Sequence, residues 1–250
     1  MITEPFAIGN SWIHRIDPRL KIVFATLYSF IIALSDRFPT LFAGLVISIS
    51  LAVMARLNIR RVSGRLAVVS GFFLLLWIVM PLTYEGPVMY RLGPLAFTRP
   101  GIILSSKITL KSISILLAFM ALVATMTFAT LGYALDRLHI SGKLVHLFLL
   151  TYRYIFVIEQ EYQRLMRAAR IRNFCPGTNM HSYKTYAYII GMLFVRASAR
   201  ARRVNQAMLC RGFKGRFYCL REFKSVRCDW FFLILMALIS TGLIYLQWIY

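Results

Sequence analysis

Two arginines in the second half of the chain stand in the same local pattern and could act as cationic docking groups. The tripeptides at 172–174 and 211–213 read Arg-Asn-Phe and Arg-Gly-Phe. This order is typical of a helix C-terminus, where Asn or Gly adopts the left-handed conformation and the next apolar residue packs back on the last turn. A guanidinium held there could form bidentate contacts with carboxylates or carbonyls of a partner.

The helix dipole offers a simpler explanation for either arginine alone. A cation near a helix C-terminus gains about 0.3–1 kcal/mol from the negative end of the dipole without any partner. The repetition at the ends of two consecutive basic helices instead favours docking of Arg172 and Arg211 into two equivalent pockets. We therefore interpret both arginines as partner-binding residues.

Two long helices are expected to position these arginines. The segment 132–227 is rich in Lys and Arg and has no full-length apolar run. It divides into predicted helices over about 144–172 and 181–211, separated by a Cys-Pro-Gly break at 175–177. The apolar stretch 144–158 is interrupted by Arg153, which at the bilayer centre would cost about 2.5–3.5 kcal/mol, so we do not expect it to cross the membrane.

The second of these helices has a basic face as well as a basic end. Arg196, Arg200 and Arg203 follow one another at helical spacing and form a possible supporting basic face. The apolar residues of this helix are placed on the opposite side in this interpretation, namely Ile189, Leu193 and Val204. Contact with anionic lipid headgroups explains the basic face as well as contact with a protein does.

The rest of the chain is predicted to be membrane-embedded. Hydrophobic residues make up 59% of the sequence and the mean hydropathy is +0.65. Apolar runs of nearly the length needed to cross a bilayer predict an all-α integral membrane protein with about five transmembrane helices plus two long basic cytoplasmic helices. The predicted spans are 22–35, 38–55, 66–83, 112–131 and 229–250.

The charge distribution predicts the orientation of these spans. The 30 Lys and Arg residues against 9 Asp and Glu give a net charge of +21. Basic segments before the first span and at 56–65 belong on the cytoplasmic side, which also places 132–228 there and leaves the loop 84–107 outside. Membrane lipids account for the excess charge, and without a recognisable motif we do not expect nucleic acid as a partner.

Several catalytic features are missing. The chain has no phosphate-binding loop of the GxxxxGK[ST] type, so ATP would be handled by another protein. The four histidines are scattered and no acidic cluster accompanies them, so we expect no metal site, no cofactor and no enzymatic activity in this chain. Two alternatives remain open: a membrane enzyme acting on a lipid phosphate, and a scaffold whose basic segment binds the membrane surface.

The sequence resembles a known family over nearly its whole length. It is similar to the transmembrane T component of energy-coupling factor (ECF) transporters, and within that family to the cobalt and nickel branch called CbiQ. The segments that carry the similarity are 14–21, 149–154, 166–174, 191–196 and 207–218.

This resemblance implies both partners and site residues. It implies a coupling subunit of an ATP-driven uptake system, in which two ATP-binding-cassette (ABC) ATPase subunits bind ATP and magnesium and a membrane S component binds the substrate. Carried over to this chain, Arg172 and Arg211 insert into the ATPases. The flanking residues are Ile171, Asn173, Cys210 and Gly212.

Two details are left open by the resemblance. Many relatives have Gly where this chain has Asn173, and Arg170 offers a competing register two residues before Arg172. The substrate is expected to be cobalt, with nickel or a vitamin as alternatives. The expected organisation is a membrane segment at 1–131, coupling helices at 132–228 and a C-terminal span at 229–250, in a multi-pass protein of the cell inner membrane.

Overall fold

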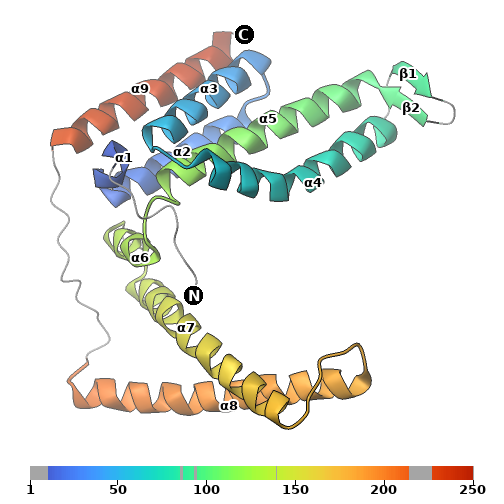
Figure 1. Cartoon of the computed structure of the whole chain (residues 1–250). Helices are drawn as coiled ribbons and strands as arrows, with labels where there is room; N and C mark the ends of the chain where they lie inside the picture. Colours follow the sequence, from blue (N-terminus) through green and yellow to red (C-terminus); the bar gives the residue numbers. More distant parts are fainter. Residues whose placement is uncertain (1–10, 85–86, 93–94, 139, 214–226, 250) are drawn as a thin grey trace. The chain divides into compact units, whose positions relative to one another are not determined.

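The computed structural model describes residues 11–84, 87–92, 95–138, 140–213 and 227–249, and it is almost entirely helical (Figure 1). The chain divides into two compact units, one formed by Gly132–Glu222 and the other by Glu4–Leu131 with Phe223–Tyr250. The predicted all-α class is confirmed.

The larger unit is a bundle of apolar helices. After the short helix α1 (Trp12–Arg15), its main elements are α2 (Pro18–Leu34), α3 (Phe38–Met54), α4 (Ile59–Thr83), α5 (Arg99–Leu122) and α9 (Arg227–Ile249). Helix α5 packs against α2, α3 and α4, and α9 packs against α2 and α3. Among the described residues, α4, α5 and α9 are long and apolar enough to cross a membrane, and α3 is a shorter apolar helix.

The fourth predicted span, at 112–131, is wrong at both ends. Helix α5 begins at Arg99, with Pro100 in its first turn, and it ends at Leu122. The basic side chains of Arg99, Lys107 and Lys111 interrupt the apolar run in this part of the helix, so the start of the helix was placed too late in the sequence. The predicted loop 84–107 is corrected as well, because β1 (Val88–Leu92) and β2 (Leu95–Thr98) form an antiparallel hairpin that leads directly into α5.

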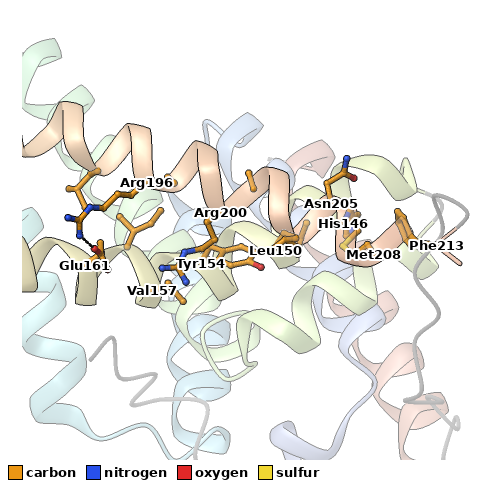
Figure 2. Close-up of a pocket in the computed structure, with 15 residues that line it drawn as sticks. His146, Leu150, Tyr154, Val157, Glu161, Arg196, Arg200, Asn205, Met208 and Phe213 are labelled. Carbon is orange, nitrogen blue, oxygen red and sulfur yellow. Dashed lines mark hydrogen bonds and ion pairs between the residues drawn. The ribbon is translucent and has the colours of Figure 1, made fainter. Parts of the chain in front are cut away.

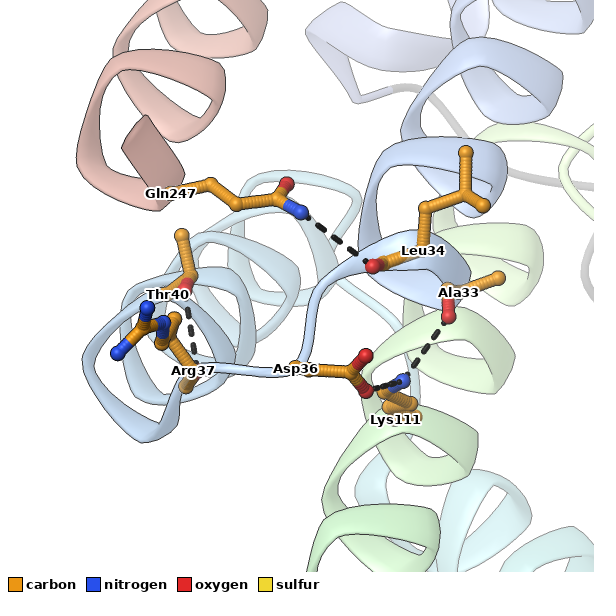
Figure 3. A network of polar contacts seen from close by, with 7 residues as sticks. All are labelled: Ala33, Leu34, Asp36, Arg37, Thr40, Lys111 and Gln247. Atoms are coloured by element: carbon orange, nitrogen blue, oxygen red, sulfur yellow. Dashed lines mark hydrogen bonds and ion pairs between the residues drawn. The ribbon is translucent and has the colours of Figure 1, made fainter. Parts of the chain in front are cut away.

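A polar network joins the C-terminal end of α2 to α5 and α9 (Figure 3). Lys111 Nζ of α5 donates to the carbonyl oxygen of Ala33 at 2.9 Å and to Asp36 Oδ1 at 3.0 Å. Gln247 Nε2 of α9 donates to the carbonyl oxygen of Leu34 at 3.3 Å. The hydrogen bond from Lys111 holds the pKa of Asp36 below its ordinary value. These side chains satisfy helix-end carbonyls that would otherwise lack a partner.

A second polar contact joins the opposite end of α2 to α9. The Asp17 N–H donates to Asp229 Oδ1 at 2.9 Å, and the Asp17 side chain caps α2 by accepting from the Arg19 N–H at 3.0 Å. Lys21 is 1% exposed and is attracted by both carboxylates. Hydrogen bonds therefore join α2 and α9 near both ends, and the two helices run parallel to each other.

The smaller unit contains the two long helices expected from the sequence. They are α7 (Gly142–Ile171) and α8 (Met180–Cys210), and they follow α6 (Phe128–Arg137) in the chain. Helix α7 includes the stretch 144–158 and is not among the helices apolar enough to span a membrane. The two helices pack against each other, with the end of each lying beside the first half of the other.

We predict that Asp229→Ala destabilises the larger unit by about 1–3 kcal/mol, because it leaves the Asp17 N–H without its acceptor and removes one of the two carboxylates that attract the buried Lys21. Thermal unfolding of the purified chain in detergent would measure this loss. The matched control is Asp36→Ala, which removes an exposed ion pair and should cost less than about 1 kcal/mol. Equal effects of the two substitutions would contradict the structural role assigned to Asp229.

Candidate functional site

Helix α7 ends in a Schellman motif that positions Arg172. Arg172 is the C-cap residue, and Asn173 follows in the left-handed conformation with φ 65°. The Asn173 N–H donates to the carbonyl oxygen of Arg170 at 3.0 Å, and the Phe174 N–H donates to that of Ala169 at 3.1 Å. These two bonds satisfy carbonyls of the last turn, so the chain leaves the helix in one defined direction.

Helix α8 ends in the same way. Arg211 is its C-cap residue, and Gly212 is left-handed with φ 75°. The Gly212 N–H donates to the carbonyl oxygen of Leu209 at 2.9 Å, and the Phe213 N–H donates to that of Met208 at 3.0 Å. The two ends are thus equivalent in backbone conformation as well as in sequence.

This equivalence bears on the register of the first motif. Arg172 and Arg211 occupy the same C-cap position, whereas Arg170 lies two residues earlier, inside α7. Arg172 is therefore the geometric counterpart of Arg211.

Both arginine ends are open to solvent or to a partner. Arg172 and Arg211 are exposed, as are the flanking residues Asn173, Cys210 and Gly212. Ile171 is 86% exposed, which is unusual for a large apolar side chain. Within the described part of the chain, neither guanidinium forms a hydrogen bond or an ion pair. Two uncompensated cations, one of them beside an exposed apolar residue, are suited to contact with another protein.

A phenylalanine anchors each end on the neighbouring helix. Phe174 is 7% exposed and packs with Met166 and Ile189, and its ring meets Tyr186 edge to face with 5.7 Å between the ring centroids. Phe213 lies with its ring centroid 5.9 Å from that of His146, near the start of α7. The apolar residue after each left-handed position therefore restrains the end that carries the arginine.

These contacts also indicate how far apart the two ends lie. The end of α8 is beside His146, while α7 continues from there for 25 residues to Ile171. At 1.5 Å per residue, the two arginine ends are separated by roughly 35–40 Å along α7.

The basic face of α8 is partly engaged within the unit (Figure 2). Arg196 donates to Glu161 of α7, and Arg164 also pairs with Glu161 at 3.6 Å. The hydrogen bond from Arg196 and the nearby arginines hold the pKa of Glu161 below its ordinary value. Arg200 points into the groove between α7 and α8, whereas Arg203 is exposed and is not among the residues that line this groove.

The division of α8 into basic and apolar sides is corrected by the structure. Leu193 and Val204 line the same groove as Arg196 and Arg200 instead of lying opposite them. The residues at 193, 196, 200 and 204 are three or four positions apart, which places them on one helical face. The Glu161–Arg196 pair was also missed, because two residues 35 positions apart meet only through the packing of α7 on α8.

The same chain matches the family model for cobalt transport proteins, CbiQ, over residues 9–219, which is most of its length. The chain belongs to this family. It is thereby a transmembrane T component of the ECF transporter type, and this family is not a family of enzymes.

Relatives with recorded names agree with this assignment. A protein of Thermosediminibacter oceani, 23% identical with 94% of this chain and 92% of the relative covered, is named energy-coupling factor transporter transmembrane protein EcfT. One of Listeria innocua has the same name and is 25% identical, with 99% and 98% covered. The cobalt transport protein CbiQ of Salmonella typhimurium is 26% identical over 66% of this chain and 76% of its own length.

The left-handed positions should respond differently to substitution. Gly212→Ala places a Cβ in the left-handed region and should destabilise the end of α8 by about 1–2 kcal/mol. Asn173→Gly should be neutral or slightly stabilising, because glycine adopts the same conformation without this cost. Hydrogen exchange of the amides of residues 208–213 and 169–174 would measure local opening. Unchanged hydrogen exchange in Gly212→Ala would contradict this prediction.

Proposed function

We propose that this chain links two ABC-type ATPase subunits to a substrate-binding membrane S component, and that Arg172 and Arg211 are the residues that dock into the ATPases. ATP and magnesium belong to the ATPases in this proposal, and the chain transmits their movement without any chemistry of its own. The basic face formed by Arg196, Arg200 and Arg203 has a supporting role at most, because part of it is engaged with Glu161.

The observation that carries the proposal is the repeated helix end. Two exposed arginines without ion-pair partners among the described residues sit at equivalent C-cap positions, each followed by a left-handed residue and an anchored phenylalanine. One such end has a sufficient explanation in the helix dipole, whereas two suit two copies of a similar pocket. The distance of roughly 35–40 Å between them along α7 suits two separate subunits instead of one.

The orientation of the bundle supports a cytoplasmic position for the coupling helices. Because α2 and α9 run parallel, Asp17 and Asp229 lie on the same side of the membrane. The N-terminal end of α9 is then on the same side as the N-terminal end of α2, where the sequence is rich in basic residues. The positive-inside rule assigns that side to the cytoplasm. We propose the cell inner membrane as the location of the chain.

We propose cobalt as the transported ion. The family description and the name of the Salmonella typhimurium relative support cobalt over nickel or a vitamin. Within the described residues, no three His, Cys, Asp or Glu side chains gather into a metal-ligand set, so the proposal assigns ion capture to the S component.

The docking role predicts a large effect of two single substitutions. Arg172→Ala and Arg211→Ala should each weaken ATPase binding by about 2–5 kcal/mol, or roughly thirtyfold or more, because each leaves a desolvated acceptor in the ATPase pocket unpaired. Co-purification of the full chain with its ATPase subunits over a salt series would measure this, with transport as a second readout.

Two variants serve as controls for this experiment. Arg202→Ala removes an exposed positive charge from α8, and Arg170→Ala does the same two residues before Arg172; both should keep nearly normal binding. Wild-type assembly and transport by the double variant Arg172→Ala, Arg211→Ala would overturn the proposal. A large loss in Arg170→Ala but not in Arg172→Ala would move the first docking residue to position 170.

The substrate can be tested separately. In vesicles that contain the complete transporter, we expect ATP-dependent uptake of radioactive Co²⁺ that unlabelled Ni²⁺ inhibits only weakly. Equal or better uptake of Ni²⁺ would contradict cobalt while leaving the docking role intact.

A further inference from the structure

An apolar groove lies between α7 and α8, and it extends from Glu161 to His146 and Phe213 beside the end of α8 (Figure 2). Its volume of about 490 Å³ is within the range of roughly 300–1,000 Å³ typical of small-molecule sites. Small side chains at Ala197 and Ala201 leave the space open on the α8 side. Larger apolar side chains form the rest of the lining, among them Leu150, Tyr154, Val157, Leu193 and Val204.

One end of this groove has an excess of positive charge. Glu161 is paired with Arg196 and Arg164 and is also attracted by Arg200. A single carboxylate thus faces three guanidinium groups. Arg200 lines the groove and has no hydrogen bond or ion pair with any residue that the structure describes. The groove therefore combines an apolar body with an unsatisfied cation.

We propose that this groove binds an anionic phospholipid, with an acyl chain along the apolar lining and the phosphate at Arg200. The apolar walls gain free energy by covering hydrocarbon, and the phosphate supplies the negative charge that Glu161 alone does not provide. Basic residues near the membrane surface attract anionic headgroups. This inference does not depend on the docking of Arg172 and Arg211.

Charge complementarity favours a lipid over an apolar segment of another protein. An apolar helix seated in the groove would cover Arg200 without offering it an acceptor, and burial of an unpaired cation is costly. A phospholipid covers the same apolar surface and neutralises the arginine. A zwitterionic lipid fits less well, because its own cationic headgroup competes for the phosphate.

A tryptophan reporter in the groove tests the proposal on the full chain. Tyr154→Trp places the reporter in the lining, and the unsubstituted chain corrects for the native tryptophans. The protein is reconstituted in phosphatidylcholine vesicles that contain a minor fraction of lipid with brominated acyl chains, either phosphatidylglycerol or phosphatidylcholine. Brominated phosphatidylglycerol should quench the reporter more strongly at the same fraction.

Matched variants identify the source of this preference. In the reporter background, Arg200→Gln should reduce the preference for phosphatidylglycerol about fivefold, the factor expected for one arginine near an anionic lipid. Arg202→Gln removes the same charge from the same helix outside the groove and should keep the preference. Ala201→Phe fills the groove and should lower quenching by both lipids.

Three outcomes would overturn the proposal. The first is equal quenching by the two brominated lipids, which would show no selection for negative charge. The second is an unchanged preference in Arg200→Gln or an equal loss in Arg202→Gln. The third has two parts: the reporter shows no preference between the two lipids when the chain is alone, and an added partner subunit protects it completely from quenching by both. That result would make the groove a protein-docking surface.

Discussion

The left-handed residue after each of the two long helices is the constraint on which the functional geometry depends. At Asn173 and Gly212, the positive φ lets the following N–H return to a carbonyl of the last turn, so the arginine before it stays at the rim of the helix. The next phenylalanine packs on the other helix of the pair. Without that conformation, the last turn would fray, and the arginine would lose more conformational entropy when it binds a partner.

Polar and charged side chains find their partners differently in the two units. In the larger unit, polar side chains bind to helix ends, as Lys111, Gln247 and Asp229 do, because apolar surroundings leave an unpaired backbone group without water. In the smaller unit, positive charge remains in excess, and Arg172, Arg200 and Arg211 have no hydrogen bond or ion pair with a carboxylate among the described residues. These polar contacts of the larger unit are made within that unit, whereas the three cations of the smaller unit are available to external partners.

Membership of the ECF T components gives this contrast a functional meaning. The proposed coupling role requires a stable membrane anchor together with surfaces that attract other molecules. The proposed ATPase contacts are at the two ends of the helix pair, and the proposed lipid site lies between them, so the two kinds of binding use different residues. Glu161 belongs to the groove and not to the arginine ends, which allows the two sites to be tested independently.

Local features were determined by the sequence itself. The apolar runs and the pairs of Arg with Asn or Gly identified the all-α membrane class, both long basic helices and their C-terminal ends, because propensity, hydropathy and capping depend on neighbouring residues. Only the tertiary structure decided which residues meet across the chain. Arg196 with Glu161 and Asp17 with Asp229 depend on helix packing over long sequence separations. The start of α5 at Arg99 was missed because Lys107 and Lys111 interrupt its apolar run.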